Sequence, residues 1–301
     1  MNRRTFTQVL TAAALGAATP SFPAKVKNTV ASPITYKFPL SVMLWTVYGN
    51  LPFEQRLAKV AEAGYNQVEL VNEYRDWTDA DFAAANAARK RLGIRFDATA
   101  GVIQALANPS LRDAFLADLT RALKPMETLS IPAIIVLAGN VVPGLTRQQQ
   151  HDSCIETLKQ AAKIVEGRQI DGQPVRLLLE CIHLEENPQF YMTSADEGIE
   201  VVRAVNHPQV QFLYDIYHEQ MSYGNLIDKL DKHIDVIGLI HIADVPGRHE
   251  PGTGEINYAN IYRKLAQLNY RHNVAMEFMP TSDPVGTLRA AKALALSAGA
   301  A

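Results

Sequence analysis

The chain has 301 residues, of which 48% are hydrophobic and 20% charged, a balance typical of a globular protein with a large core. This composition excludes a disordered, collagen-like or coiled-coil chain. The formal net charge of −2 provides no positive field that would attract a polyanion, so we expect no nucleic-acid partner.

Residues 1–24 have the pattern of an export signal, with a basic start, an uncharged run over 9–18 and a Pro- and Ala-containing end. Arg3 and Arg4, followed by Phe6, resemble the bacterial twin-arginine signal, which serves proteins that fold before export; an ordinary secretion signal with a chance Arg pair is the alternative. The uncharged run is shorter than the roughly 20 residues that span a bilayer, so we expect no stable membrane anchor. We predict export, to the periplasm, and a linker over residues 25–37.

Residues 38–301 alternate between short apolar runs and longer stretches of helical periodicity. The expected strands are 40–45, 67–71, 94–99, 133–137, 176–181, 210–215, 236–242 and 273–278. The expected helices are 52–63, 79–92, 111–129, 151–166, 196–205, 226–234, 258–268 and 284–296. Several strands are nearly continuous in Val, Ile and Leu, as is typical of parallel strands that are buried on both faces. Eight βα units without an interrupting linker predict an α/β protein with a single (β/α)8 TIM barrel.

Two smaller features of the sequence concern a helix start and the core. Thr78, with Asp81 three residues later, has the pattern of a capping box before the second helix. Cys154 and Cys181 form no CxxC pair, so they indicate neither a zinc ribbon nor a disulfide framework, and we expect both to pack in the core.

Four of the apolar strands end in, or carry near their ends, residues that can bind a metal: Glu180, Asp215, His241 and Glu277. Their separations each correspond to about one βα unit, so a barrel would bring them to neighbouring positions on one rim, where barrel active sites lie. Three carboxylates so close together raise one another's pKa unless a cation lies among them. We therefore predict a divalent metal site, whose oxygen-rich ligand set suits Mn²⁺ or Mg²⁺, or Co²⁺, better than structural zinc.

Further polar residues follow the same strand ends. His218 lies three residues after Asp215, and the Gly- and Pro-rich loop ADVPGRHEPGTGEINY contains Arg248. We expect His218 and Arg248 to contact oxygens of an anionic or polyhydroxylated ligand. Glu73 and Trp45 are further candidates for substrate contacts, Trp45 either as a wall for a sugar ring or as a cover of the core.

The segments YDIYH, IADVPGRHEPGTGEINY and MEFMP resemble the hydroxypyruvate isomerase family of xylose isomerase-like barrels, and the similarity extends from about Phe38 to the last helix. The resemblance implies a divalent metal held by the same four residues, with the two glutamates also transferring protons. It also implies substrate contacts at His218 and Arg248, which match positions in related ketose epimerases.

The sequence departs from this family in three places. His241 stands where these isomerases usually have glutamine, as in the tagatose and psicose 3-epimerases. His183 replaces the amide of the usual Glu-Pro-Leu-Asn segment, and we retain it as a substrate contact. The export signal is unusual for an enzyme of cytoplasmic glyoxylate metabolism.

These observations predict a metal-dependent isomerase that interconverts hydroxypyruvate and tartronate semialdehyde, or a similar small hydroxy-carbonyl compound, through a cis-enediolate, with Glu180 and Glu277 as acid and base. A ketose or keto-sugar 3-epimerase with the same residues is the alternative. A non-catalytic sugar-binding barrel is less favoured because both glutamates are present. A metal-dependent phosphodiesterase would need more histidine ligands and a basic groove. The metal, the first base and the oligomeric state, a homo-oligomer included, stay open.

Overall fold

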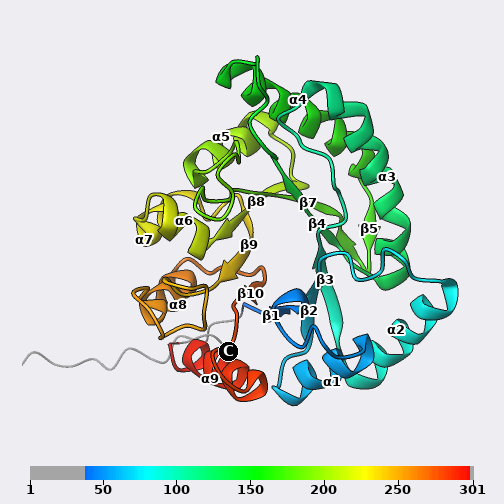
Figure 1. Cartoon of the computed structure of the whole chain (residues 1–301), viewed down its shortest axis with the longest axis vertical. Helices are drawn as coiled ribbons and strands as arrows, with labels where there is room; N and C mark the ends of the chain where they lie inside the picture. The colour runs from blue at the N-terminus through cyan, green and yellow to red at the C-terminus, as the bar shows by residue number, and fades with distance from the viewer. Residues whose placement is uncertain (1–37, 299–301) are drawn as a thin grey trace, which may run out of the picture. The chain divides into compact units, whose positions relative to one another are not determined.

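The computed structural model describes residues 38–298, so the expected signal segment 1–24 and linker 25–37 lie outside the described residues. Within that range the eight expected strands form one closed barrel, in the order β1-β10-β9-β8-β7-β4-β3-β2, with neighbours pairing in parallel (Figure 1). The strands are β1 (Leu40–Met43), β2 (Gln67–Leu70), β3 (Arg95–Thr99), β4 (Ala133–Leu137), β7 (Arg176–Glu180), β8 (Val210–Asp215), β9 (Ile237–Ile242) and β10 (Val274–Met276). The predicted (β/α)8 barrel is confirmed.

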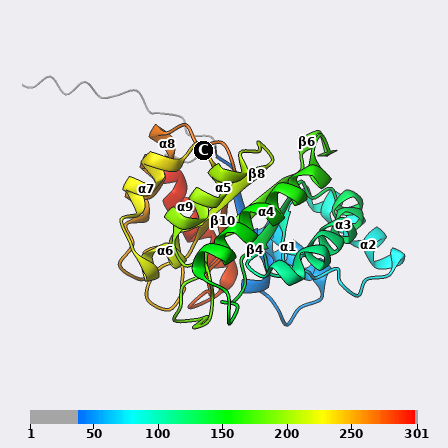
Figure 2. The ribbon, with the colours of Figure 1, turned by 90° about the horizontal axis from the view of Figure 1, so that it is seen from above.

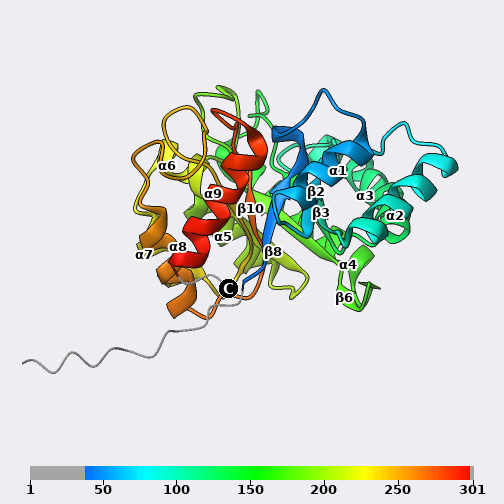
Figure 3. The same cartoon turned by 90° about the horizontal axis from the view of Figure 1, so that it is seen from below.

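Helices surround the barrel on its outer face (Figure 1). They are α1 (Phe53–Glu62), α2 (Asp79–Leu92), α3 (Arg112–Leu129), α4 (Arg147–Val165), α5 (Ala195–Val205), α6 (Ile216–Ser222), α7 (Leu226–His233), α8 (Tyr258–Gln267) and α9 (Pro284–Ser297), with 3-10 turns η1 (Leu44–Thr46) and η2 (Pro109–Leu111). Helices α4 and α5 pack side by side (Figure 2). Helix α9 contacts both α8 and α1, so the last helix closes the ring against the first (Figure 3).

The structure differs from the expected elements at a few points. It adds the short helix α6 and a two-stranded hairpin of β5 (Gln169–Ile170) and β6 (Gln173–Pro174). Helix α4 begins four residues before the expected start, because Thr146 and Gln149 form a capping box there. The first strand ends at Met43, and Trp45 lies in the 3-10 turn η1 that follows it.

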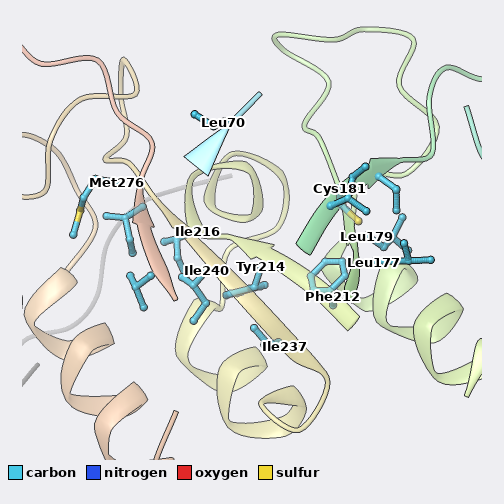
Figure 4. Close-up of a cluster of buried hydrophobic side chains, with 14 of the residues drawn as sticks. Leu70, Leu177, Leu179, Cys181, Phe212, Tyr214, Ile216, Ile237, Ile240 and Met276 are labelled. Carbon is cyan, nitrogen blue, oxygen red and sulfur yellow. The ribbon is translucent and has the colours of Figure 1, made fainter. Parts of the chain in front are cut away.

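The alternation of side chains along the strands produces two apolar sets. One set faces the helices: Leu177 and Leu179 of β7, Phe212 and Tyr214 of β8, and Ile240 of β9 belong to it (Figure 4). A separate, smaller cluster fills the barrel: Met43, Ala98, Ala133, Ile135, Leu178, Leu213, Leu239 and Ala275. These side chains form a middle layer, as in other barrels of this type.

The structure also confirms the predicted helix cap and the buried cysteines. The predicted capping box of Thr78 and Asp81 is present at the start of α2. Cys154 and Cys181 are both buried and form no disulfide, as expected for core residues. Among residues 38–298, no helix has the length and apolar character that crossing a membrane requires.

Candidate metal centre and active site

The four strand-end residues converge as the strand spacing predicts. Glu180 ends β7, Asp215 ends β8, His241 lies in β9 and Glu277 follows β10, and all four are buried. Each offers a ligand atom, and these four atoms lie within 4.8 Å of one another. His241 Nδ1 is 2.6 Å from Glu277 Oε2, 3.8 Å from Glu180 Oε1 and 3.9 Å from Asp215 Oδ2.

Three of the facing atoms have no hydrogen-bond partner within the described part of the chain: Asp215 Oδ2, His241 Nδ1 and Glu277 Oε2. Their approaches to one another are therefore charge contacts without hydrogen-bond geometry. Buried polar atoms are normally hydrogen-bonded, so three that make no hydrogen bond around one point indicate a capacity to bind a ligand. Three carboxylates and an imidazole fit a divalent cation that accepts oxygen and nitrogen ligands.

The carboxyl groups of this cluster differ in their proton affinity. Burial raises the pKa of Glu180 well above its ordinary value, and the nearby Glu277 and Asp215 raise it further. Burial alone would also raise the pKa of Glu277, but His241 and Arg248 outweigh it and hold that pKa well below its usual range. The crowding of like charges around Glu180 is what a bound cation would relieve.

A fifth residue completes the surroundings of His241. Glu69 of β2 is fully buried, and its Oε2 lies 2.9 Å from His241 Nε2. We did not predict Glu69 from the sequence, because it lies inside an apolar strand rather than after its end. An acidic residue flanked by Val68 and Leu70 is the signal that could have revealed it.

Arg248 and Trp45 lie beside the cluster. The guanidinium of Arg248 is 2.9 Å from Glu277 Oε2 and 3.7 Å from Asp215 Oδ2, and it packs over the rings of Trp45 and Tyr217. Trp45 Nε1 donates a hydrogen bond of 3.0 Å to Glu277 Oε1. Burial lowers the pKa of Arg248, but the surrounding carboxylates outweigh it and raise that pKa above its ordinary value. Arg248 is therefore a permanent cation beside Glu277.

His183 and His218 form a pair next to Asp215. Their Nδ1 atoms are 2.6 Å apart, and the His218 amide donates to Asp215 Oδ1 at 3.0 Å. Burial lowers the pKa of both imidazoles, which matches a bond in which one neutral ring donates and the other accepts. Glu186, which the sequence reasoning missed, binds Arg248 at 3.2 Å and accepts a hydrogen bond from Tyr217.

Glu73 lies apart from this group. Its Oε2 accepts a hydrogen bond from the Val71 amide at 2.8 Å, and its Oε1 is 3.5 Å from Arg56. Burial raises the pKa of Glu73. These contacts join the end of β2 to helix α1, and the structure does not bring Glu73 together with the four converging residues.

Asp244 holds the loop that carries Arg248. This buried carboxylate accepts hydrogen bonds from four backbone amides, those of Val245, Gly252, Gly254 and Ile256, at 2.9–3.0 Å. A Cβ at Gly254 would lie 1.9 Å from the Val245 carbonyl oxygen, so this close approach requires glycine. Arg248 itself has a left-handed backbone with φ of 57°. The loop is a fixed frame that directs Arg248 toward Glu277.

A protein-family model described as xylose isomerase-like TIM barrel matches residues 57–295. The chain belongs to this family. The hydroxypyruvate isomerase of Escherichia coli K12 is 28% identical over 254 residues, which cover 83% of this chain and 96% of the relative. The 2-oxo-tetronate isomerase of Pectobacterium atrosepticum is 28% identical over 250 residues, covering 80% of this chain and 92% of the relative. These relatives confirm the isomerase class that the sequence predicted.

Solved structures of other proteins superpose over most of the barrel. One, titled AP endonuclease family 2, from Brucella melitensis, has a TM-score of 0.74 and 25% identity and covers 84% of this chain and 96% of its own. The D-psicose 3-epimerase of Clostridium cellulolyticum H10, solved with D-tagatose, also has a TM-score of 0.74, with 19% identity, and covers 87% of this chain and all of its own. At that identity the second likeness shows the fold alone.

Proposed function

We propose that this isomerase interconverts hydroxypyruvate and tartronate semialdehyde, or a closely similar hydroxy-carbonyl acid, with a divalent cation held by Glu180, Asp215, His241 and Glu277. The observation that carries the proposal is the convergence of four ligand atoms within 4.8 Å of one another, three of which, Asp215 Oδ2, His241 Nδ1 and Glu277 Oε2, make no hydrogen bond. The relatives named hydroxypyruvate isomerase and 2-oxo-tetronate isomerase support the substrate class.

The bound cation, for which we expect Mn²⁺ or Mg²⁺, would act as a Lewis acid that polarises the substrate carbonyl. Glu180 and Glu277 transfer the proton: one removes it from the carbon that bears the hydroxyl group, and the other returns a proton to the neighbouring carbon, by way of a cis-enediolate of the substrate. Both lie at the cluster, on β7 and just after β10.

The residues around the two glutamates prepare them for this role. Trp45 and Arg248 contact different oxygens of Glu277, so they fix the plane of its carboxylate. The positive charge of Arg248 also favours negative charge that develops on the substrate oxygens. His183 and His218, which contact each other beside Asp215, are placed to donate to or accept from a substrate hydroxyl.

A ketose or keto-sugar 3-epimerase is the second candidate, in which the second glutamate returns the proton to the same carbon from the opposite face. Exposed apolar side chains at the ends of several barrel strands favour it: Trp45 after β1, Leu137 at the end of β4, Leu184 after β7 and Met279 after β10. A three-carbon acid makes little use of an apolar rim, whereas the carbon backbone of a longer sugar would reach it.

Proton NMR in D₂O tests the two candidates directly. Catalytic amounts of Mn²⁺-loaded protein are incubated with hydroxypyruvate and, separately, with a panel of ketoses, each with an EDTA-treated control. Metal-dependent formation of tartronate semialdehyde supports the isomerase. Turnover or deuterium incorporation restricted to a ketose carbon replaces it with the epimerase, and no conversion of any substrate contradicts both.

Export by the twin-arginine route is part of the same proposal, since a protein that folds before export can take up its cation in the cytoplasm. Fractionation of cells that express the full chain tests it. Substitution of both Arg3 and Arg4 by lysine should retain the protein in the cytoplasm. Unchanged periplasmic recovery of this variant would contradict the route.

A further inference from the structure

The middle layer of the barrel contains a carboxylate among apolar side chains. Glu69 pairs in register with Met43 of β1 and Ala98 of β3, two members of the apolar cluster that fills the barrel. Its residue exposure is 0%. Moving a carboxylate from water into such surroundings is strongly unfavourable unless the charge has a specific partner. The position of Glu69 therefore requires an explanation in terms of that partner.

Among the described residues, His241 is the hydrogen-bond partner of Glu69. Glu69 Oε2 lies 2.9 Å from His241 Nε2, whereas Glu69 Oε1 has no hydrogen-bond partner there. The two residues are 172 positions apart in the sequence, so the contact is made by the barrel and not by local chain geometry. Two fully enclosed side chains thus meet directly behind the four converging ligand atoms.

This contact determines which nitrogen of His241 faces the cluster. An ionised carboxylate only accepts hydrogen bonds, so the Nε2 atom of His241 carries the hydrogen that Glu69 receives. In the neutral imidazole, the form that binds a cation, the other nitrogen, Nδ1, then has the lone pair that a cation among Glu180, Asp215 and Glu277 would bind. A rotated ring, or one with its hydrogen on Nδ1, would direct a hydrogen into the cluster instead.

We infer that Glu69 is a positioning residue of the metal centre: it fixes the orientation and tautomer of His241 so that Nδ1 is free to bind the divalent cation. This inference rests on the metal site of the proposed function. It goes beyond that proposal because Glu69 is not one of the four residues that would bind the cation. Replacing a carboxylate that holds a ligating histidine in this way commonly weakens metal affinity by about 10- to 100-fold.

The neighbouring strand provides a matched control. Asp97 of β3 is also a buried carboxylate inside the barrel, but it accepts hydrogen bonds from Ser41 and Asn273 and does not contact His241. Its replacement by asparagine disturbs the same barrel interior without touching the proposed metal ligands. Any difference between the two variants therefore reports on the contact with His241.

The first test is the affinity of the full chain for Mn²⁺, measured by electron paramagnetic resonance of the free ion. Glu69→Gln should raise the dissociation constant by about 10- to 100-fold, whereas Asp97→Asn should change it by less than about twofold. Equal constants for Glu69→Gln and the unmodified chain would overturn the inference while leaving the metal site intact. Failure of the unmodified chain to bind Mn²⁺ would overturn the metal site itself and the inference with it.

The second test needs no folded Glu69 variant. The unmodified chain, labelled with ¹⁵N in its histidines and loaded with diamagnetic Zn²⁺, is examined by NMR, and the His241 signals are assigned by their loss in His241→Asn. We expect His241 to carry its hydrogen on Nε2, with Nδ1 showing the shift of a metal-bound nitrogen. A hydrogen on Nδ1 and a metal-bound Nε2 would overturn the inference.

Discussion

Two polar clusters lie inside the barrel, one at each end of its strands, and they differ in how their hydrogen-bonding groups are used. At the amino end, Asp97 accepts from Ser41 at 2.7 Å and from Asn273 at 2.6 Å, and Arg176 donates to the Gly238 carbonyl at 2.8 Å. Both Asp97 oxygens therefore have partners. A satisfied network of this kind holds neighbouring strands together.

At the carboxyl end, buried carboxylates and a histidine meet without hydrogen bonds between their facing atoms. Asp215 Oδ2, His241 Nδ1 and Glu277 Oε2 lie close to one another without hydrogen-bond geometry. The difference shows which buried carboxylates serve the fold and which have capacity for a ligand. If this distinction is correct, substitutions at the two ends should affect different properties of the protein.

The largest expected effect is on turnover at the carboxyl end. Glu277→Gln retains the size of the side chain but loses the titratable proton. We therefore expect kcat to fall by about 10²- to 10⁴-fold, the usual contribution of an acid–base group. The measurement is the rate of isomerisation, with circular dichroism to confirm the fold. Asp97→Asn is the control and should retain activity. Near-normal turnover in Glu277→Gln would contradict the proton transfer that we propose.

The second effect concerns stabilisation by the cation. A ligand at 100 times its dissociation constant stabilises a folded protein by about 2.7 kcal/mol, so Mn²⁺ should raise the melting temperature of the unmodified chain. Asp215→Asn should lose most of this increase, and EDTA should abolish it in both proteins. Thermal unfolding with and without Mn²⁺ measures it. The same increase in Asp215→Asn as in the unmodified chain would show that the cation binds elsewhere.

Asp244 allows a further test, because it is a fully hydrogen-bonded carboxylate at the carboxyl end of the barrel, where the facing atoms of the metal cluster make no hydrogen bonds. Its replacement by alanine leaves four amides without their acceptor, and an unsatisfied buried donor costs about 1–3 kcal/mol. We expect a loss of stability in this range, faster hydrogen exchange over residues 245–256 and a lower kcat as Arg248 loses its position. Asp244→Asn, which retains one acceptor oxygen, should lose less. Unchanged exchange in the alanine variant would show that the loop is held by other contacts.

The smallest effect is a pH-dependent one at the amino end. Burial, together with the nearby Glu69, raises the pKa of Asp97 well above its ordinary value. A raised carboxyl pKa in the folded state means that stability is highest where the group is protonated and is lost as the pH rises from the unfolded value toward the folded one. Asparagine does not ionise, so the stability that Asp97→Asn gains relative to the unmodified chain should increase as the pH rises above the ordinary aspartate pKa, by at most about 1.4 kcal/mol per pH unit. A difference that does not change with pH would contradict this account.

The barrel could be predicted from the sequence because its strands are nearly continuous apolar runs separated by helical periods. The parts that the sequence did not reveal are short. Helix α6 has seven residues, and its buried positions include the polar His218 and Glu219, so no apolar period marks it. The β5–β6 hairpin did have a signal in the sequence, the dipeptide Asp171-Gly172, which is typical of a tight hairpin turn. Both residues have positive φ in that turn.

The cluster itself could be predicted because each of its members stands at or near the end of an apolar strand, where the fold determines its neighbours. Glu69 and Glu186 could not be found in this way. The role of Glu69 depends on the register between β2 and its neighbours, and the contact of Glu186 with Arg248 depends on how two separate loops approach each other. Glu73 shows the converse: it follows a strand, yet it turns toward Arg56.

The way in which Asp244 holds its loop has a consequence for protein engineering. One internal carboxylate secures the backbone at Val245, Gly252, Gly254 and Ile256, so much of the loop is held from the inside of the protein rather than from its exposed surface. Thr253 and Glu255 are exposed in this frame. A library randomised at these two positions should therefore yield mostly folded proteins, which makes the loop a practical place for engineered sequence changes.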